Sequence, residues 1–172
     1  MKLEELKFAP FNDLDKNYAL LTAGSKDDFN TMTISWGGFG TIWNKPVVTV
    51  YVKPIRYTYK FMEDNDFFTV SFYDDKYKKD LLTLGTKSGR DVDKISLTGL
   101  NPFFLYDSVT FKEAKITLIC KKIYYQDMDL EVIEKNLTSD IYDRFYGDDP
   151  IHRMYIGEVI DIIKNDWQLN YN

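Results

Sequence analysis

Histidine and cysteine, the side chains that most often carry metal or nucleophilic chemistry, are nearly missing from this sequence. Its 172 residues include one histidine, His152, and one cysteine, Cys120. A single cysteine cannot form an internal disulfide, which fits a reducing cytoplasm. Two such residues cannot supply the four ligands of a zinc site, so no metal site is predicted. A catalytic triad would have to use His152, which has no nucleophile motif beside it. If the chain is an enzyme, we expect a cofactor to supply its chemistry.

Long apolar runs and an excess of positive charge are also absent. No stretch approaches the roughly 18 to 20 apolar residues of a membrane span. The N-terminal stretch MKLEELKF carries two glutamates and no apolar core, unlike a signal peptide. The net charge of -5 argues against a nucleic-acid partner, because phosphate binding requires a basic surface. We therefore expect a cytoplasmic protein that binds neither membranes nor nucleic acids.

The composition is that of a folded domain. Hydrophobic residues make up 44% of the chain, a normal share for a globular protein. A chain of 172 residues is long enough to bury a core. Because no internal repeat, low-complexity segment or linker interrupts it, residues 1–172 are predicted to form a single domain.

Hydrophobic periodicity predicts a fold that is mainly β. Strands are expected at residues 18–24, 30–36, 47–52, 67–73, 115–129 and 153–164. The first two would form a hairpin, and the continuous run 47–52 is typical of a strand buried on both faces. Helices are predicted from Thr58 as N-cap, over 75–85 with Gly85 at its end, and over 138–147. Since strands and helices do not alternate regularly, a closed antiparallel β-barrel with inserted helices is favoured over a doubly wound sheet.

The segment NTMTISW, residues 30–36, places a row of hydroxyls beside an aromatic and glycine-rich stretch. Thr31, Thr33 and Ser35 fall on one face of the predicted strand. The stretch that follows, GGFGTIW, is expected to be a mobile loop. It has neither the spacing of a dinucleotide fingerprint nor a Walker lysine, and no helix follows it. Two interpretations remain open: an edge strand with a surface turn, or a site for a flat ring with polar edges.

Two further segments are suited to an anion. In KPIRYTYKF (53–61), Arg56 and Thr58 stand where a helix is expected to start, and helix N-termini attract anions. In GTKSGRDVDK (85–94), glycines permit unusual backbone angles beside Ser88 and two cationic side chains. Each segment alone is also compatible with an ordinary cap or connection. Together with the hydroxyl strand, they favour a phosphorylated ring ligand.

Four segments occur in the order and approximate spacing seen in one family: NTMTISW, KPIRYTYKF, TLGTKSGRDVDK and HRMYIGEV. From about residue 14 to residue 163 the chain resembles the flavin reductase-like proteins, the FMN-binding split-barrel group that includes flavoredoxin. The resemblance implies an FMN-binding split barrel, assembled as a homodimer with FMN near the subunit interface. It also implies an oxidoreductase that takes hydride from NAD(P)H and passes electrons to an acceptor that the sequence does not identify.

The resemblance also implies which residues contact the cofactor. Thr33 and Ser35, with groups of Asn30, Thr31, Met32 and Trp36, would bind the polar edges of the flavin. Arg56, Tyr57 and Thr58 would hold the phosphate, and Ser88 and Gly89 would close on the flavin tail. Trp36 is as well suited to a core or dimer-interface position. Many relatives carry a short non-aromatic loop where this chain has GGFGTIW.

His152, just before the last predicted strand, is the one candidate for a catalytic role. A histidine there would orient the nicotinamide or supply charge near the flavin ring; the alternative is a histidine that only forms a hydrogen bond at a strand start. Two other functions stay open. One is a non-enzymatic FMN electron carrier of the flavoredoxin type. The other is haem binding, for which a single histidine offers one axial ligand at most.

Overall fold

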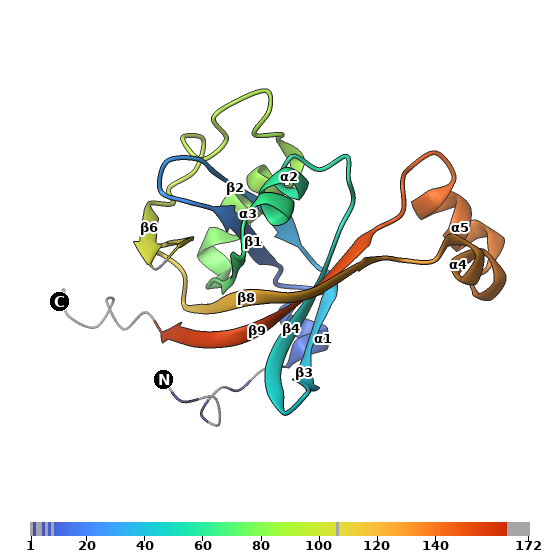
Figure 1. The fold of residues 1–172 in the computed structure, drawn as a ribbon. Coiled ribbons are helices and arrows are strands. Elements are labelled where there is room, and N and C mark those ends of the chain that lie inside the picture. Colours follow the sequence, from blue (N-terminus) through green and yellow to red (C-terminus); the bar gives the residue numbers. More distant parts are fainter. Residues whose placement is uncertain (1, 3–4, 6, 8, 106, 165–172) are drawn as a thin grey trace.

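A seven-stranded antiparallel sheet, in the order β2-β1-β5-β8-β9-β4-β3, forms most of the molecule (Figure 1). The computed structural model describes residues 2, 5, 7, 9–105 and 107–164. The sheet strands are β1 (Ala19–Gly24), β2 (Phe29–Ile34), β3 (Gly37–Ile42), β4 (Lys45–Val52), β5 (Phe67–Phe72), β8 (Ile116–Asp127) and β9 (Arg153–Lys164). A separate hairpin consists of β6 (Pro102–Leu105) and β7 (Ser108–Phe111). The helices are α1 (Pro10–Asp13), α2 (Thr58–Asp64), the 3-10 turn η2 (Asp75–Tyr77), α3 (Lys78–Thr86), α4 (Leu130–Asn136) and α5 (Ser139–Tyr146).

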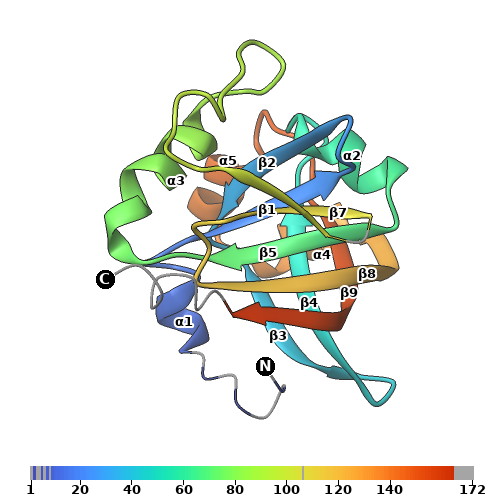
Figure 2. The same ribbon diagram turned by 90° about the vertical axis from the view of Figure 1, so that its left-hand side faces the viewer.

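The sheet curls into a barrel that is split along one side (Figure 2). The expected first hairpin is confirmed, with Leu21 opposite Met32. The strands at the two ends of the order are β2 and β3, and only Ser35 and Trp36 separate them in the chain. Among the described residues, no backbone ladder joins these two strands. The outer backbone groups of β2 therefore remain available to another partner.

Alternating side chains of six strands fill the barrel. Leu21, Val50, Phe68 and Tyr155 are fully buried members of this core. Burying one such side chain contributes roughly 1.5–3 kcal/mol. A side chain at Gly157 would collide with the ring of Phe68, so glycine allows β9 to pass this packed centre. Cys120 is part of the core, where burial raises the pKa of its thiol.

The expectation of a mobile loop at GGFGTIW is wrong. Residues 37–42 form the edge strand β3, which pairs with β4 in the register Phe39 opposite Val48. The turn between them is made by Trp43 and Asn44, whose φ angles are 51° and 57°. Two consecutive positive φ angles match the tight hairpin turns that follow the natural twist of a sheet. Pairing with β4 overrides the low strand propensity of the glycines.

Three smaller expectations also need correction. β4 is not buried on both faces: Val50 lies in the core, whereas Tyr51 is half-buried. Thr58 is the first residue of α2 rather than its N-cap, which is Tyr57. Gly85 lies inside α3, which ends at Thr86. The hairpin β6–β7, the short helix α1 and helix α4 were not predicted.

Helices α4 and α5 form an arm that projects from the barrel between β8 and β9 (Figure 1). The two strands pair along their length, with Asp127 opposite Arg153 where the arm leaves and rejoins the barrel. The Asp129 side chain caps α4 by accepting a hydrogen bond from the Val132 N–H at 3.1 Å. In the described part of the chain, no helix has both the length and the apolar character needed to cross a membrane.

Candidate functional site

Two adjoining cavities lie along β2. The arm-side cavity, about 310 Å³, extends from β2 to the arm and to the start of β9. The loop-side cavity, about 230 Å³, lies between β2, the start of α2 and the segment 84–94. Met32, Thr33 and Arg56 line both. The two cavities therefore form one groove, and its halves differ in chemical character.

The loop-side half is cationic. Arg56, Lys87, Arg90 and Lys94 line it, together with a single carboxylate, Asp91. The Lys94 side chain is unusual, because the residue is only 4% exposed and its ammonium donates to two backbone carbonyls, of Leu84 at 2.9 Å and of Lys87 at 3.2 Å. Burial, with the nearby Arg56 charge, lowers the pKa of Lys94 to about 8. A buried cation beside three further cations, with a single carboxylate nearby, favours an anionic ligand.

A hydrogen bond and a close backbone approach tie the segment 84–94 and α2 to β2. The Asn30 amide donates to the Thr58 hydroxyl at 2.7 Å. A side chain at position 89 would collide with that same amide and approach the ring of Tyr57, so Gly89 lets its loop lie directly against β2. Asn30, Tyr57, Thr58 and Ser88 line the cavity, whereas Gly89 supports it from behind.

The predicted row of hydroxyls is only partly available to a ligand. The Thr31 hydroxyl is fully buried away from both cavities, where it bonds Thr22 at 2.8 Å and the Leu21 carbonyl at 3.2 Å. The Thr33 hydroxyl donates to the Leu81 carbonyl of α3. Ser35 has no such partner among the described residues and lines the arm-side cavity. Thr31 and Thr33 could therefore contribute mainly through the backbone of the edge strand.

The arm-side half is aromatic. Trp36 packs edge-on against Phe145 of α5, with ring centroids 5.0 Å apart, and its ring lies 5.2 Å from that of His152. Trp36 remains 41% exposed and lines the cavity, so it is not a core residue. Arg144 and Tyr51 complete the polar rim of this half. A flat ligand could pack here against the Trp36 side.

Lys53 fastens the arm to the barrel at this cavity. Its ammonium donates to the Phe145 carbonyl at 2.5 Å and to the Asp149 carboxylate at 2.7 Å. The lysine side chain is buried, while that of Asp149 is half-exposed. We refer to Lys53, Phe145 and Asp149 as the arm clasp. It positions Phe145 over the cavity.

His152 lies at the inner wall of the arm-side cavity. It is 8% exposed, and its Nδ1 lies 3.1 Å from the Tyr146 hydroxyl. Burial, reinforced by the Lys53 and Arg56 charges and opposed by Asp149, lowers the pKa of His152 from 6.5 to about 4. The imidazole is therefore neutral at pH 7.

The groove brings together most of the residues proposed from the sequence, and it adds others. Lys94, Lys53 and Arg144 were not proposed, nor was Tyr146, which is not part of the lining but contacts His152. Lys94 belongs to the segment GTKSGRDVDK, so its charge was visible but its burial was not. The other three depend on how the arm folds back, for which a single sequence carries no signal. No group of three or more potential metal ligands is found among the described residues.

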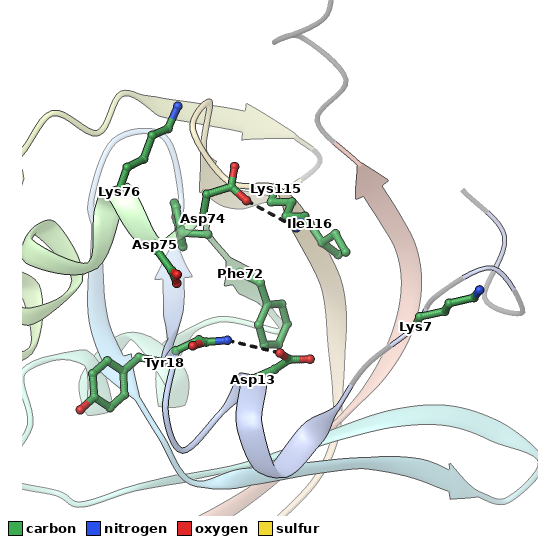
Figure 3. A pocket seen from close by; sticks show the side chains of 11 residues that line it. Lys7, Asp13, Tyr18, Phe72, Asp74, Asp75, Lys76, Lys115 and Ile116 are labelled. Carbon is green, nitrogen blue, oxygen red and sulfur yellow. Dashed lines mark hydrogen bonds and ion pairs between the residues drawn. The ribbon is translucent and has the colours of Figure 1, made fainter.

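A larger cavity, about 570 Å³, lies near α1 and includes none of the proposed residues (Figure 3). Three acidic and three basic side chains line it. Several already pair with one another, as in the ion pair of Lys115 with Asp74 at 3.4 Å and the hydrogen bond of Asn17 to Asp13 at 3.5 Å. Such balanced, solvated charges do not favour a particular ligand.

Comparisons with known proteins agree on one group. The family model described as "Flavin reductase like domain" matches residues 11–171. A flavoredoxin structure from Methanosarcina acetivorans is similar at 22% identity and a TM-score of 0.68, over 87% of this chain and 69% of the other. The flavoredoxin of Desulfovibrio vulgaris (Miyazaki F) is similar at 21% identity and a TM-score of 0.65, over 87% of this chain and 70% of the other. The styrene monooxygenase flavin reductase of Pseudomonas putida S12 is similar at 14% identity and a TM-score of 0.62, over 87% of this chain and 80% of the other. No curated protein matches the chain. At these identities the solved structures show the shared fold.

Proposed function

Because the chain belongs to the flavin reductase-like family, we propose that it binds FMN in the groove along β2 and acts as an oxidoreductase that accepts hydride from NAD(P)H. The observation that supports this most strongly is the polarity of the groove. Its loop-side half is cationic and its arm-side half is aromatic. A phosphorylated ligand with a flat ring matches both halves in one orientation only.

The residues of the loop-side half fit a phosphate. The Lys94 ammonium is bonded only to carbonyls, and Arg56 forms no ion pair among the described residues. A phosphate would balance the positive charge that Asp91 alone does not offset, with Arg56, Lys94 and Thr58 as its ligands and Ser88 beside the tail. Helix α2 has only seven residues, so we assign the anion to these side chains rather than to the helix terminus.

The residues of the arm-side half fit a ring with polar edges. In the described part of the chain, no strand pairs with the outer side of β2, so its backbone would bind those edges, together with the Ser35 hydroxyl. Trp36 and Phe145 would exclude water from one side of the ring. When bound, FMN would supply the hydride-accepting and electron-transferring chemistry that the protein side chains lack.

Flavin titration tests the binding proposal. FMN and riboflavin are titrated separately into the protein, and quenching of flavin fluorescence gives each affinity. Arg56→Ala should weaken FMN about ten- to a hundred-fold, the range of a charge-assisted hydrogen bond, and leave riboflavin nearly unchanged. Lys115→Ala, in the other cavity, serves as the control. Equal losses for both flavins would show that Arg56 is structural, and no binding of either flavin would refute the proposal.

Anaerobic mixing with NADH and NADPH tests the reaction. We expect the flavin absorbance of the FMN-loaded protein to bleach with at least one of the two donors. If neither donor bleaches it while dithionite does, the protein is an FMN electron carrier rather than a nicotinamide-dependent enzyme. The physiological electron acceptor then has to be sought separately in either case.

The proposal includes a homodimer in the cytoplasm. Support for the dimer comes from the arm, where Leu130, Val132 and Ile141 expose apolar side chains and whose Arg144 and Phe145 line the arm-side cavity. A second subunit would cover this surface and wall the cavity. A reducing compartment agrees with the single free thiol, Cys120.

A further inference from the structure

Tyr146 and His152 form a buried hydrogen bond between the arm and the barrel. Tyr146 is the last residue of α5, and His152 directly precedes β9. The distance from the Tyr146 hydroxyl to His152 Nδ1 is 3.1 Å, and the two rings meet edge-on at 86°. The His152 carbonyl also accepts a hydrogen bond from the Met128 N–H at 2.9 Å, so the backbone of the histidine is held as well.

The direction of this hydrogen bond follows from the partners available. A neutral imidazole carries one N–H, and either ring nitrogen can hold it. If Nδ1 carried the proton, the phenolic hydrogen of Tyr146 would need another acceptor. Among the described residues, the Tyr146 hydroxyl has no hydrogen-bond partner other than His152. The phenol therefore donates, Nδ1 accepts, and the imidazole proton is on Nε2.

The second ring nitrogen faces the cavity. In the described part of the chain, His152 Nε2 has no hydrogen-bond partner, and the Tyr73 hydroxyl is the one buried side-chain polar atom that lacks one. His152 Nε2 is consequently accessible, and the accessible space next to it is the arm-side cavity. The surrounding charged groups are Lys53, Arg56, Arg144 and Asp149.

We infer that Tyr146 is a positioning residue, which fixes His152 as the neutral Nε2–H tautomer so that the ring presents a hydrogen-bond donor to the arm-side cavity. The ligand that suits such a donor has a neutral acceptor on a flat ring, such as a carbonyl or carboxamide oxygen. The identity of the ligand rests on the proposed function, whereas the tautomer does not. Since Tyr146 belongs to the arm, the arm sets the hydrogen-bonding polarity of the site.

Nuclear magnetic resonance of the full-length, ¹⁵N-labelled protein tests the tautomer directly, because the chain has a single histidine and its ring signals need no assignment. At pH 7 without flavin, long-range ¹H–¹⁵N spectra should show Nε2 protonated and Nδ1 unprotonated. In Tyr146→Phe, the Nδ1 signal should move toward that of a nitrogen that accepts no hydrogen bond, and the Nδ1–H form should become populated. A protonated Nδ1 in the unmodified protein would overturn the inference without any variant.

Tyr142→Phe is the matched control. Tyr142 lies one turn earlier on α5 with its ring 6.3 Å from that of Tyr146, and it has no hydrogen bond to His152. Its spectrum should equal that of the unmodified protein, and amide spectra show that both variants are folded. Identical histidine signals in folded Tyr146→Phe would also refute the positioning role. Adding FMN and then NAD⁺ should slow exchange of the Nε2–H proton with water; if it does not, the ligand assignment fails while the tautomer stands.

Discussion

At the scale of single residues, His152 couples the site to the stability of the fold. Its pKa is lowered from 6.5 to about 4 by burial and by neighbouring cations, so protonation favours the unfolded chain. Stability from this residue is complete above pH 6.5 and is lost as the pH falls toward 4. The total loss is at most about 3 kcal/mol.

Comparison with His152→Asn isolates this effect from other acid-sensitive groups. Urea unfolding at pH 7 and at pH 4.5 should show a larger drop in the free energy of unfolding for the unmodified protein than for the variant. The difference between the two drops measures the histidine alone. Parallel pH profiles would mean that His152 titrates normally in the folded state.

Lys94 predicts that the affinity for FMN falls as the pH rises, whereas the contribution of His152 to stability is lost as the pH falls. Its pKa of about 8 in the free protein means that the ammonium is charged at pH 7 and neutral at pH 9.5. FMN affinity should therefore fall, about ten-fold, as the pH rises through 8, because the neutral amine loses its charge-assisted bond to the phosphate. In Lys94→Met the affinity should be weak and independent of pH over this range. Lys87→Met, an exposed lysine of the same loop, should retain the pH dependence; the same flat profile there would argue against Lys94.

The sequence predicted well which polar residues lie near one another, and it predicted poorly which hydrogen-bond partners their side chains have. Asn30, Arg56 and Ser88 were expected around one ligand and line one cavity. Thr31 was expected on the same strand face as Ser35, yet its hydroxyl forms a hydrogen bond with Thr22 inside the barrel. Whether a strand hydroxyl bonds a neighbouring strand or a ligand depends on tertiary packing, which alternation alone does not specify.

At the scale of elements, the arm clasp predicts that a single lysine holds α5 in place. Lys53→Met would remove the ammonium that donates a hydrogen bond to the Phe145 carbonyl. We expect a loss of about 1–3 kcal/mol in the free energy of unfolding, together with faster amide hydrogen exchange in α5. Lys115→Met, which breaks the exposed pair with Asp74, should change stability by no more than about 1 kcal/mol. Unchanged exchange in α5 would show that other contacts hold the arm.

The β3–β4 turn predicts a stabilising change. Trp43 and Asn44 both have positive φ angles, which are strained for residues with a side chain. Because Trp43 is 62% exposed, its packing offsets little of this strain. Asn-Gly is the preferred pair for this turn. Trp43→Asn combined with Asn44→Gly should raise the free energy of unfolding by roughly 0.5–1 kcal/mol, measured by thermal or urea unfolding. A loss of stability would reveal a packing role for Trp43.

The elements themselves were predicted unevenly. Long strands with a sustained hydrophobic pattern, such as residues 153–164, were placed correctly, because the pattern spans many residues. The strand β3 was missed because three of its six residues are glycine, and the pairing that stabilises it lies in the neighbouring β4. The pair β6 and β7 was missed because four-residue strands carry almost no periodic signal.

At the scale of the whole molecule, the exposed apolar side chains of the arm predict self-association. Sedimentation at micromolar concentration should give a dimer, and Val132→Lys should shift it toward the monomer, since a buried charge opposes association. Lys112→Glu, a charge change outside the arm, is the comparison. A monomer in the unmodified protein with FMN bound would remove the dimer from the proposal.

Evolution can treat the arm as a replaceable segment. It leaves and rejoins the barrel at Asp127 and Arg153, which already face each other in paired strands. Insertions or deletions between these positions therefore leave the strand register unchanged. Because the arm contributes Phe145 to the cavity wall and Tyr146 as the hydrogen-bond partner of His152, such changes would alter which molecules are admitted while the cationic half of the groove persists. Descendants of this chain could acquire new ligands through changes in the arm alone, while the barrel keeps its structure.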